Sequence, residues 1–229
     1  MESELSSWLG ASWETAALMF DRLFIPFWET VYMVLVSTIL SLVFGLALAV
    51  VMVVTGAKGL HPCRSLYTGL DFVVNLLRSF PFIILIIAII PFTRFVVGTS
   101  IGSTATIVPL TIAATPFVAR IMEASLMEVD RGVIEAARSF GAGNLQIIFK
   151  VMFKEALPAI TLNIAVVAIN LLGYSAMAGA VGGGGLGDTA IKYGYYRFEA
   201  DTMIASVILL IVMVQVIQML GNFFYQRLK

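Results

Sequence analysis

Residues 31–54, VYMVLVSTILSLVFGLALAVVMVV, contain no charged side chain. As an α-helix with a rise of about 1.5 Å per residue, this segment would be about 36 Å long, enough to cross the hydrocarbon core of a bilayer. The rest of the chain is also apolar, with a mean hydropathy of +0.98 and charged residues at only 12% of the 229 positions. Soluble domains carry about twice that share of charge. We therefore predict an all-α integral membrane protein.

Four further membrane spans are predicted from apolar segments at 72–92, 101–119, 159–181 and 202–224. Proline removes a helical hydrogen bond, so Pro81 is expected to bend the second span, and Pro109 and Pro116 to make the third span irregular. Residues 1–27 are acidic at the start, where a signal peptide would be basic, and are expected to remain as an interfacial segment. The prediction is five transmembrane helices.

The distribution of lysine and arginine predicts the orientation, because cytoplasmic loops carry an excess of both. One side of the predicted spans carries four of these residues, and the other carries ten, namely Lys58, Arg64, Arg78, Arg120, Arg131, Arg138, Lys150, Lys154, Arg227 and Lys229. The N-terminus is therefore expected outside, and the C-terminus and segment 120–158 in the cytoplasm. Trp8, Trp13 and Trp28 then fit either an outer aromatic belt or ordinary packing of an interfacial helix.

The segment 120–158 is the longest polar interruption of the chain. Asp130 is suited to cap a helix that Gly141 and Gly143 would end, and Asn144 to cap a second one, which predicts two short helices at an angle. Residues 120–155 hold five basic and five acidic side chains, so this helix pair offers no positive surface for nucleic acid. A plain connector needs only a few residues. A docking surface for a cytoplasmic partner explains the length better.

The sequence E135-A-A-R-S-F-G141 resembles the EAA motif of ABC-importer permeases, whose loop seats in a cleft of an ATPase subunit. The resemblance implies a type I importer fold over 28–229, a coupling loop at about 130–158, and ATPase docking through Glu135, Ala136, Ala137, Arg138 and Gly141. ATP and magnesium would be bound by that partner, and none by this chain. The end of the motif differs here, because Val151, Phe153 and Lys154 replace its isoleucine, leucine and proline, and Pro158 follows later.

Further segments resemble the permeases of methionine importers, namely W28-E-T, R78-S-F-P-F-I-I-L, the segment from Pro91 to Gly102, and the segment from Gly173 to Gly187. Members of that family move D- and L-methionine inward across the bacterial cytoplasmic (inner) membrane. The resemblance implies a homodimeric permease, two ATPase subunits and an extracytoplasmic binding protein. Five helices hardly enclose an aqueous path alone, which also favours a symmetric dimer.

Other motifs carry less weight. Residues 182–187, GGGGLG, are followed by Asp188 where a phosphate-binding loop requires lysine, so the chain is not expected to hydrolyse ATP. The glycines are interpreted as a flexible outer end of span four, with close packing as the alternative. Tyr174, Ser175 and Met177 lie among small residues and are candidates for the translocation pathway or a gate, or for core filling. The lone Cys63 and His61 are interpreted as an apolar filler and a surface residue.

Two other functions remain open at this point. An ion-coupled secondary transporter usually places an ionisable group near the midplane, but no Asp or Glu occurs at 72–122, at 156–187 or after Asp201. A membrane anchor for a soluble partner would carry the same docking loop, and only a flux assay separates it from a transporter.

The orientation can be tested with single cysteines in a chain in which Cys63 is replaced. A cysteine at Ser7 is expected to react with a membrane-impermeant thiol reagent in intact cells. A cysteine at Gly143 is expected to react only after the membrane is opened. The reverse labelling pattern would contradict both the orientation and the cytoplasmic position of the docking loop.

Overall fold

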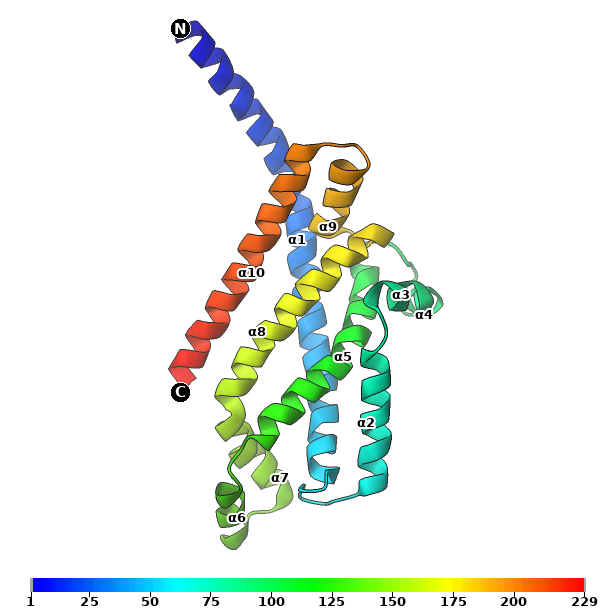
Figure 1. The fold of residues 1–229 in the computed structure, drawn as a ribbon, viewed down its shortest axis with the longest axis vertical. Helices are drawn as coiled ribbons and strands as arrows, with labels where there is room; N and C mark the ends of the chain where they lie inside the picture. Colours follow the sequence, from blue (N-terminus) through cyan, green and yellow to red (C-terminus); the bar gives the residue numbers. More distant parts are fainter. Residues whose placement is uncertain (1, 229) are drawn as a thin grey trace.

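The computed structural model describes residues 2–228, with side chains from residue 20 onward, and this part of the chain is helical without strands. Figure 1 shows the N-terminal end of α1 and the helix α6 at opposite ends of the molecule. The helices are α1 (Glu2–Thr55), α2 (Arg64–Arg78), α3 (Phe82–Ala88), α4 (Ile90–Val97), α5 (Ser103–Met127), α6 (Arg131–Ser139), α7 (Asn144–Gln146), the π-turn η1 (Ile147–Met152), α8 (Phe153–Ala178), the 3₁₀ turn η2 (Gly179–Val181), α9 (Gly185–Thr189), the π-turn η3 (Ala190–Tyr195) and α10 (Ala200–Leu228).

In the part of the chain that the structure describes, four helical stretches are long and apolar enough to cross a membrane, at 20–55, 103–127, 144–181 and 200–228. They cover the predicted first, fourth and fifth spans and all but the first two residues of the third, which are thereby confirmed as helices. The first is longer than predicted, because α1 continues without a break from Glu2 into the span. Segment 1–27 is therefore not a separate element. Trp8 and Trp13 lie outside the residues whose side chains are described, whereas Trp28 is exposed.

The second predicted span, 72–92, is bent at Pro81 as expected, but the bend is sharp enough to divide it into separate helices. It consists of α2 and α3, whose axes differ by 98° across residues 79–81, followed by α4. Pro81 causes the break, because proline pushes the preceding residue, Phe80, out of the helical region of backbone space. At about 1.5 Å per residue α2 is only about 22 Å long, too short to cross the bilayer core alone. The pair is a broken span or a re-entrant segment.

The predicted irregularity of the third span is wrong. Helix α5 runs through Pro109 and Pro116 without interruption and ends at Met127, eight residues beyond the predicted end. Its most apolar window is 61% buried inside the protein, the largest share among the long helices. Packing on both sides therefore holds the helix straight enough to keep its remaining hydrogen bonds, as is common for membrane helices that contain proline.

The expectation of a short second helix after Gly143 is corrected as well. The helix that begins at Asn144 continues through η1 and α8 to Val181, so it is the start of the fourth long stretch. The N-cap is Gly143, not Asn144. Only α6 is a short, separate helix in the predicted coupling loop.

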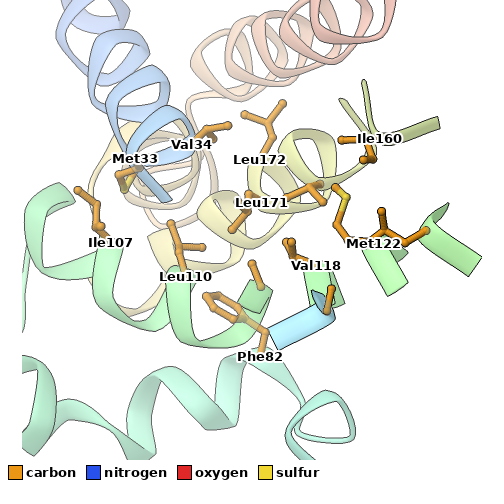
Figure 2. Close-up of a cluster of buried hydrophobic side chains, with 14 of the residues drawn as sticks. Met33, Val34, Phe82, Ile107, Leu110, Val118, Met122, Ile160, Leu171 and Leu172 are labelled. Carbon is orange, nitrogen blue, oxygen red and sulfur yellow. The ribbon is translucent and has the colours of Figure 1, made fainter. Parts of the chain in front are cut away.

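The core lies between α1, α5 and α8, with α10 packed on α8 and α2 packed on α5. Figure 2 shows buried side chains from α1, α3, α5 and α8 meeting in this core, among them Met33, Val34, Phe82, Ile107, Leu110, Val118, Met122, Ile160, Leu171 and Leu172. Aliphatic and methionine side chains fill it because helices in lipid associate mainly by close packing.

Glycine allows the closest of these helix contacts. A Cβ atom built on Gly45 of α1 would lie 2.5 Å from Cγ1 of Val118 and 3.0 Å from the carbonyl oxygen of Thr115, both on α5. Gly221 of α10 meets Ala165 of α8 in the same way, at 2.4 Å. Gly69 of α2, by contrast, has no atom within 4 Å of such a Cβ.

Gly45→Ala is expected to lower stability by roughly 1–3 kcal/mol, the usual cost of overpacking a core, because α1 and α5 must separate. Gly69→Ala is the matched control and is expected to leave stability unchanged or to raise it, because alanine favours helix. The midpoint of thermal unfolding in detergent, followed by size-exclusion chromatography, measures both. Equal midpoints for Gly45→Ala and the unsubstituted chain would show that Gly45 does not set the α1–α5 spacing.

Candidate functional site

Helix α6 is defined at both ends by specific backbone caps. The Asp130 carboxylate accepts a hydrogen bond from the Gly132 N–H at 2.6 Å, which confirms the predicted N-cap. At the other end the Gly141 N–H donates to the Arg138 carbonyl at 2.9 Å, and the Ala142 N–H donates to the Ala137 carbonyl at 3.1 Å. This pair of bonds is a Schellman motif, which needs a left-handed residue. Gly141 supplies it with φ +81°.

Gly143 plays a different part from Gly141. Its φ of −72° and ψ of 160° are extended, and its N–H donates to the Gln146 side chain at 3.1 Å, so it begins the next helix. The predicted stop at Gly141 is therefore confirmed, and Gly143 is a start. Two caps separated by a single residue fix the angle between α6 and the helix that leads into α8.

The five predicted docking residues do not share one face of α6. Glu135 and Arg138, together with Arg131 and Ile134, line a cavity of about 500 Å³. Ala137 is half-buried and packs on the core with Ile134, while Ala136 is exposed. Gly141 is exposed at the C-terminal end, with no atom within 4 Å of a Cβ built on it.

The outer face of α6 is apolar, and sequence reasoning did not identify it. Val133, Ala136 and Phe140 follow one another at helical spacing, opposite the cavity, and Phe140 is 92% exposed. Beyond the turn, Leu145 at 71% and Phe149 at 58% are exposed as well. We call Val133, Ala136 and Phe140 the outer face. In the sequence, an aromatic residue directly before a capping glycine, Phe140 before Gly141, could have indicated this surface.

The wall opposite α6 is the turn that follows α1. This turn, residues 56–60, lines the cavity, and the Leu60 carbonyl accepts a hydrogen bond from Arg138 at 3.4 Å. His61 is exposed, as expected, but its ring lies within hydrogen-bonding distance of the Asn144 side chain. The cysteine beside it, Cys63, is exposed instead of filling the core. These contacts link the segment after α1 to Arg138, before the connection between α6 and α7, and to Asn144, after it.

An ion-paired cluster joins α2 to α5 beside this cavity. Arg120, expected in a loop, is on α5 and pairs with Asp71 of α2 and with Glu123, the latter at 2.8 Å. The Tyr67 hydroxyl of α2 donates to the other Glu123 oxygen at 3.0 Å. Glu123 is only 2% exposed. Buried carboxylates require such partners, so neither acid is free to bind a coupling ion.

At the opposite end of the molecule, the glycine-rich segment 182–187 is tightly packed, which contradicts the interpretation as a flexible end. The Gly185 N–H donates to the Glu29 carboxylate at 2.7 Å, and the Leu186 N–H donates to the Thr30 hydroxyl at 2.9 Å. A Cβ on Gly187 would lie 2.4 Å from the Ala176 carbonyl oxygen. Close packing, the alternative interpretation, holds. The residues Glu29 and Thr30 belong to the W28-E-T sequence and hold the start of α9 against α1.

The three candidate pathway residues lie on different sides of α8. Tyr174 stacks on Phe82 of α3 with ring centroids 4.6 Å apart. Ser175 is buried and its hydroxyl donates to the Leu172 carbonyl at 2.8 Å. Met177 is 53% exposed. Among the described side chains, no three His, Cys, Asp or Glu residues converge as a metal site requires.

Comparison with known proteins shows which family the chain resembles. The family described as "Binding-protein-dependent transport system inner membrane component" matches residues 45–229. The probable D-methionine transport system permease protein MetI of Vibrio cholerae is 48% identical over 211 residues, covering 92% of this chain and 94% of the relative. The methionine import system permease protein MetP of Bacillus subtilis is 47% identical over 150 residues, covering 66% and 68%.

A solved structure titled as an inward-facing conformation of the MetNI methionine ABC transporter superposes with a TM-score of 0.90 at 43% identity. The match covers 92% of this chain and 98% of the solved one. By this family match and these relatives, the chain belongs to the inner membrane components of binding-protein-dependent transport systems, the permease subunits of ABC importers.

Proposed function

We propose that the chain is the permease subunit of an ATP-driven importer of D- and L-methionine, working as a homodimer with two separate ATPase subunits and an extracytoplasmic binding protein. The observation that carries the proposal is the 48% identity to a probable D-methionine permease over 92% of the chain. The likeness to the MetNI transporter, with a TM-score of 0.90, supports the same assignment. ATP and magnesium belong to the ATPase subunits.

The outer face is where the ATPase docks in this proposal. An exposed phenylalanine at the tip of a short, capped helix provides apolar area that enters a cleft without a large ordering cost. The outer face is the part of α6 directed away from the protein, whereas Glu135 and Arg138 line the cavity. Docking therefore depends on Ala136 and Phe140 more directly than on the two charged residues. Gly141 acts by holding the turn.

The second copy packs against exposed apolar surface within the membrane. On α8 and the η2 turn that follows it, the residues Val166, Gly173, Met177 and Ala180 are exposed at helical spacing, and small residues among them allow close approach of another helix. A path between two copies would run beside this strip, with Met177 facing it. Ser175, turned into the core, would act on the path only indirectly.

Transport follows from how α6 is attached. Only residues 128–130 separate α5 from α6, and only residues 140–143 separate α6 from the helix that includes α8. When two ATPases close on ATP, they draw the two copies of α6 together, and α5 and α8 move with them. The dimer changes from inward-open to outward-open, and hydrolysis reverses the change. With the predicted orientation of the chain, α6 faces the cytoplasm and α9 lies at the extracytoplasmic end of the protein.

Phe140→Ser is expected to reduce the ATPase subunit that copurifies with the tagged chain by roughly tenfold or more, as expected for a central aromatic anchor. The chain itself should fold normally, because Phe140 is 92% exposed and buries little area. Phe198→Ser is the matched control, since Phe198 is 87% exposed between η3 and α10, at the end opposite α6 (Figure 1). Equal loss of ATPase from both variants would refute docking through the outer face.

Proteoliposomes with the chain, its ATPase and its binding protein test the transport function. ATP supplied on the ATPase side of the membrane is expected to drive uptake of labelled L- and D-methionine. A proton or sodium gradient alone is not expected to drive this uptake. Gly141→Ser should lower uptake per ATP hydrolysed, because a side chain at φ +81° is strained by roughly 1–2 kcal/mol. Gly143→Ser should not, because serine is a favoured N-cap. Uptake driven by an ion gradient would favour a secondary transporter, and docking without any flux would favour a membrane anchor.

A further inference from the structure

Helix α6 directs charged residues toward its own protein. Arg131, Glu135 and Arg138 lie at positions i, i+4 and i+7, so they project from one side of the helix, and all three line the 500 Å³ cavity. The side that faces away is apolar. Docking of an ATPase uses the outer face and does not explain a charged inner face. All three side chains are exposed, so they keep their hydration and can be reached by a ligand in the cavity.

The cavity has the size and composition of a ligand site. Pockets for small molecules measure about 300–1,000 Å³ and combine apolar walls with a few polar groups. Here Leu60, Ile134 and Met127 form the accessible apolar wall, and Lys58 lies on the 56–60 turn across from α6. Glu123 also lines the cavity but is only 2% exposed. The lining thus holds cations and anions together around an apolar interior.

The charged side chains that line the cavity do not all neutralise one another. Among the side chains that the structure describes, Lys58, Arg131 and Glu135 form no ion pair, and Arg138 contacts only the Leu60 carbonyl. Glu123 is already paired with Arg120 and bonded by Tyr67. Two cations and one carboxylate on the cavity wall are therefore available to a ligand.

We propose that this cavity binds a small zwitterion. Lys58 and Arg131 would hold its anionic group, Glu135 its ammonium group, and Met127 with Ile134 its apolar part. A simple anion fits less well, because it would leave the Glu135 carboxylate without a partner. Two sources carry the required chemistry: a free amino acid, and the headgroup of an aminophospholipid such as phosphatidylethanolamine. The site lies behind the coupling helix and is separate from the path between two copies.

A ligand at this position would join α6 to the end of α1. It would touch Glu135 on α6 and Lys58 on the 56–60 turn at once, and so hold the docking helix in a fixed position against the bundle. The proposal does not depend on which substrate the chain transports. Its test is a binding measurement, and uptake in proteoliposomes decides the transport function separately.

Native mass spectrometry of the full-length chain provides the test. The chain, delipidated in detergent, is titrated in separate samples with phosphatidylethanolamine, phosphatidylglycerol and L-methionine, and occupancy per chain is measured. At least one of the two zwitterions is expected to bind with one ligand per chain, in preference to phosphatidylglycerol. The sample that shows binding identifies the source. Absence of binding by both zwitterions, or equal binding of phosphatidylglycerol, would overturn the proposal.

Matched substitutions locate the binding. Glu135→Gln and Arg131→Gln each remove one charge from the cavity and are expected to weaken zwitterion binding roughly tenfold or more, as loss of a charged hydrogen bond does. Glu128→Gln and Arg64→Gln make the same charge changes at exposed residues outside the lining and should bind as the unsubstituted chain does. All four variants are compared by their size-exclusion profiles first. Binding unaffected by Glu135→Gln in a correctly folded sample would overturn the ammonium contact and the zwitterion assignment with it.

Discussion

The close approach of α1 to α5 positions the rest of the site. Gly45 brings α1 against Val118 at a distance that leaves no room for a Cβ atom. The same two helices then end beside one cavity, α1 at the 56–60 turn and α5 three residues before α6. One wall of the cavity therefore follows from α1, and the other follows from α5. A wider spacing between these helices would separate the turn from α6 and open the site.

The sequence predicted the features that depend on local chemistry. Uncharged runs identified the long helices, because each must be apolar over the thickness of the bilayer. The Asp130 cap and the Gly141 stop were also predictable, since both rest on residues that suit one backbone position. The EAA resemblance then predicted a coupling loop and an ABC-importer permease, and the family comparisons confirm the permease family. What the apolar pattern did not show was that α2 is too short to span.

Features that depend on tertiary packing were not predictable in this way. Pro81 breaks a helix, whereas Pro109 and Pro116 do not, because α5 is enclosed by its neighbours and α2 is not. The glycines at 182–187 suggest flexibility when read as a sequence, yet Glu29 and Thr30, more than 150 residues away, hold the amides of Gly185 and Leu186. Arg120 was counted with the loop charges, because one of its two ion-pair partners, Asp71, lies far away in the sequence on α2. The division of α6 into a charged inner face and an apolar outer face could not be predicted, because it depends on where the cavity lies.

The contacts of α2 and α3 also restrict how far α5 and α8 can move relative to each other. Helix α2 is bound to α5 by the Arg120 ion pairs, and α3 is stacked on α8 through Phe82 and Tyr174. The broken span therefore acts as a brace between the two long helices on either side of α6. A shift of α5 relative to α8 would have to break a partly buried ion pair or an aromatic stack. In the proposed dimer, spin labels on α5 and α8 of one chain are expected to keep their separation, while labels on two copies would report the proposed movement.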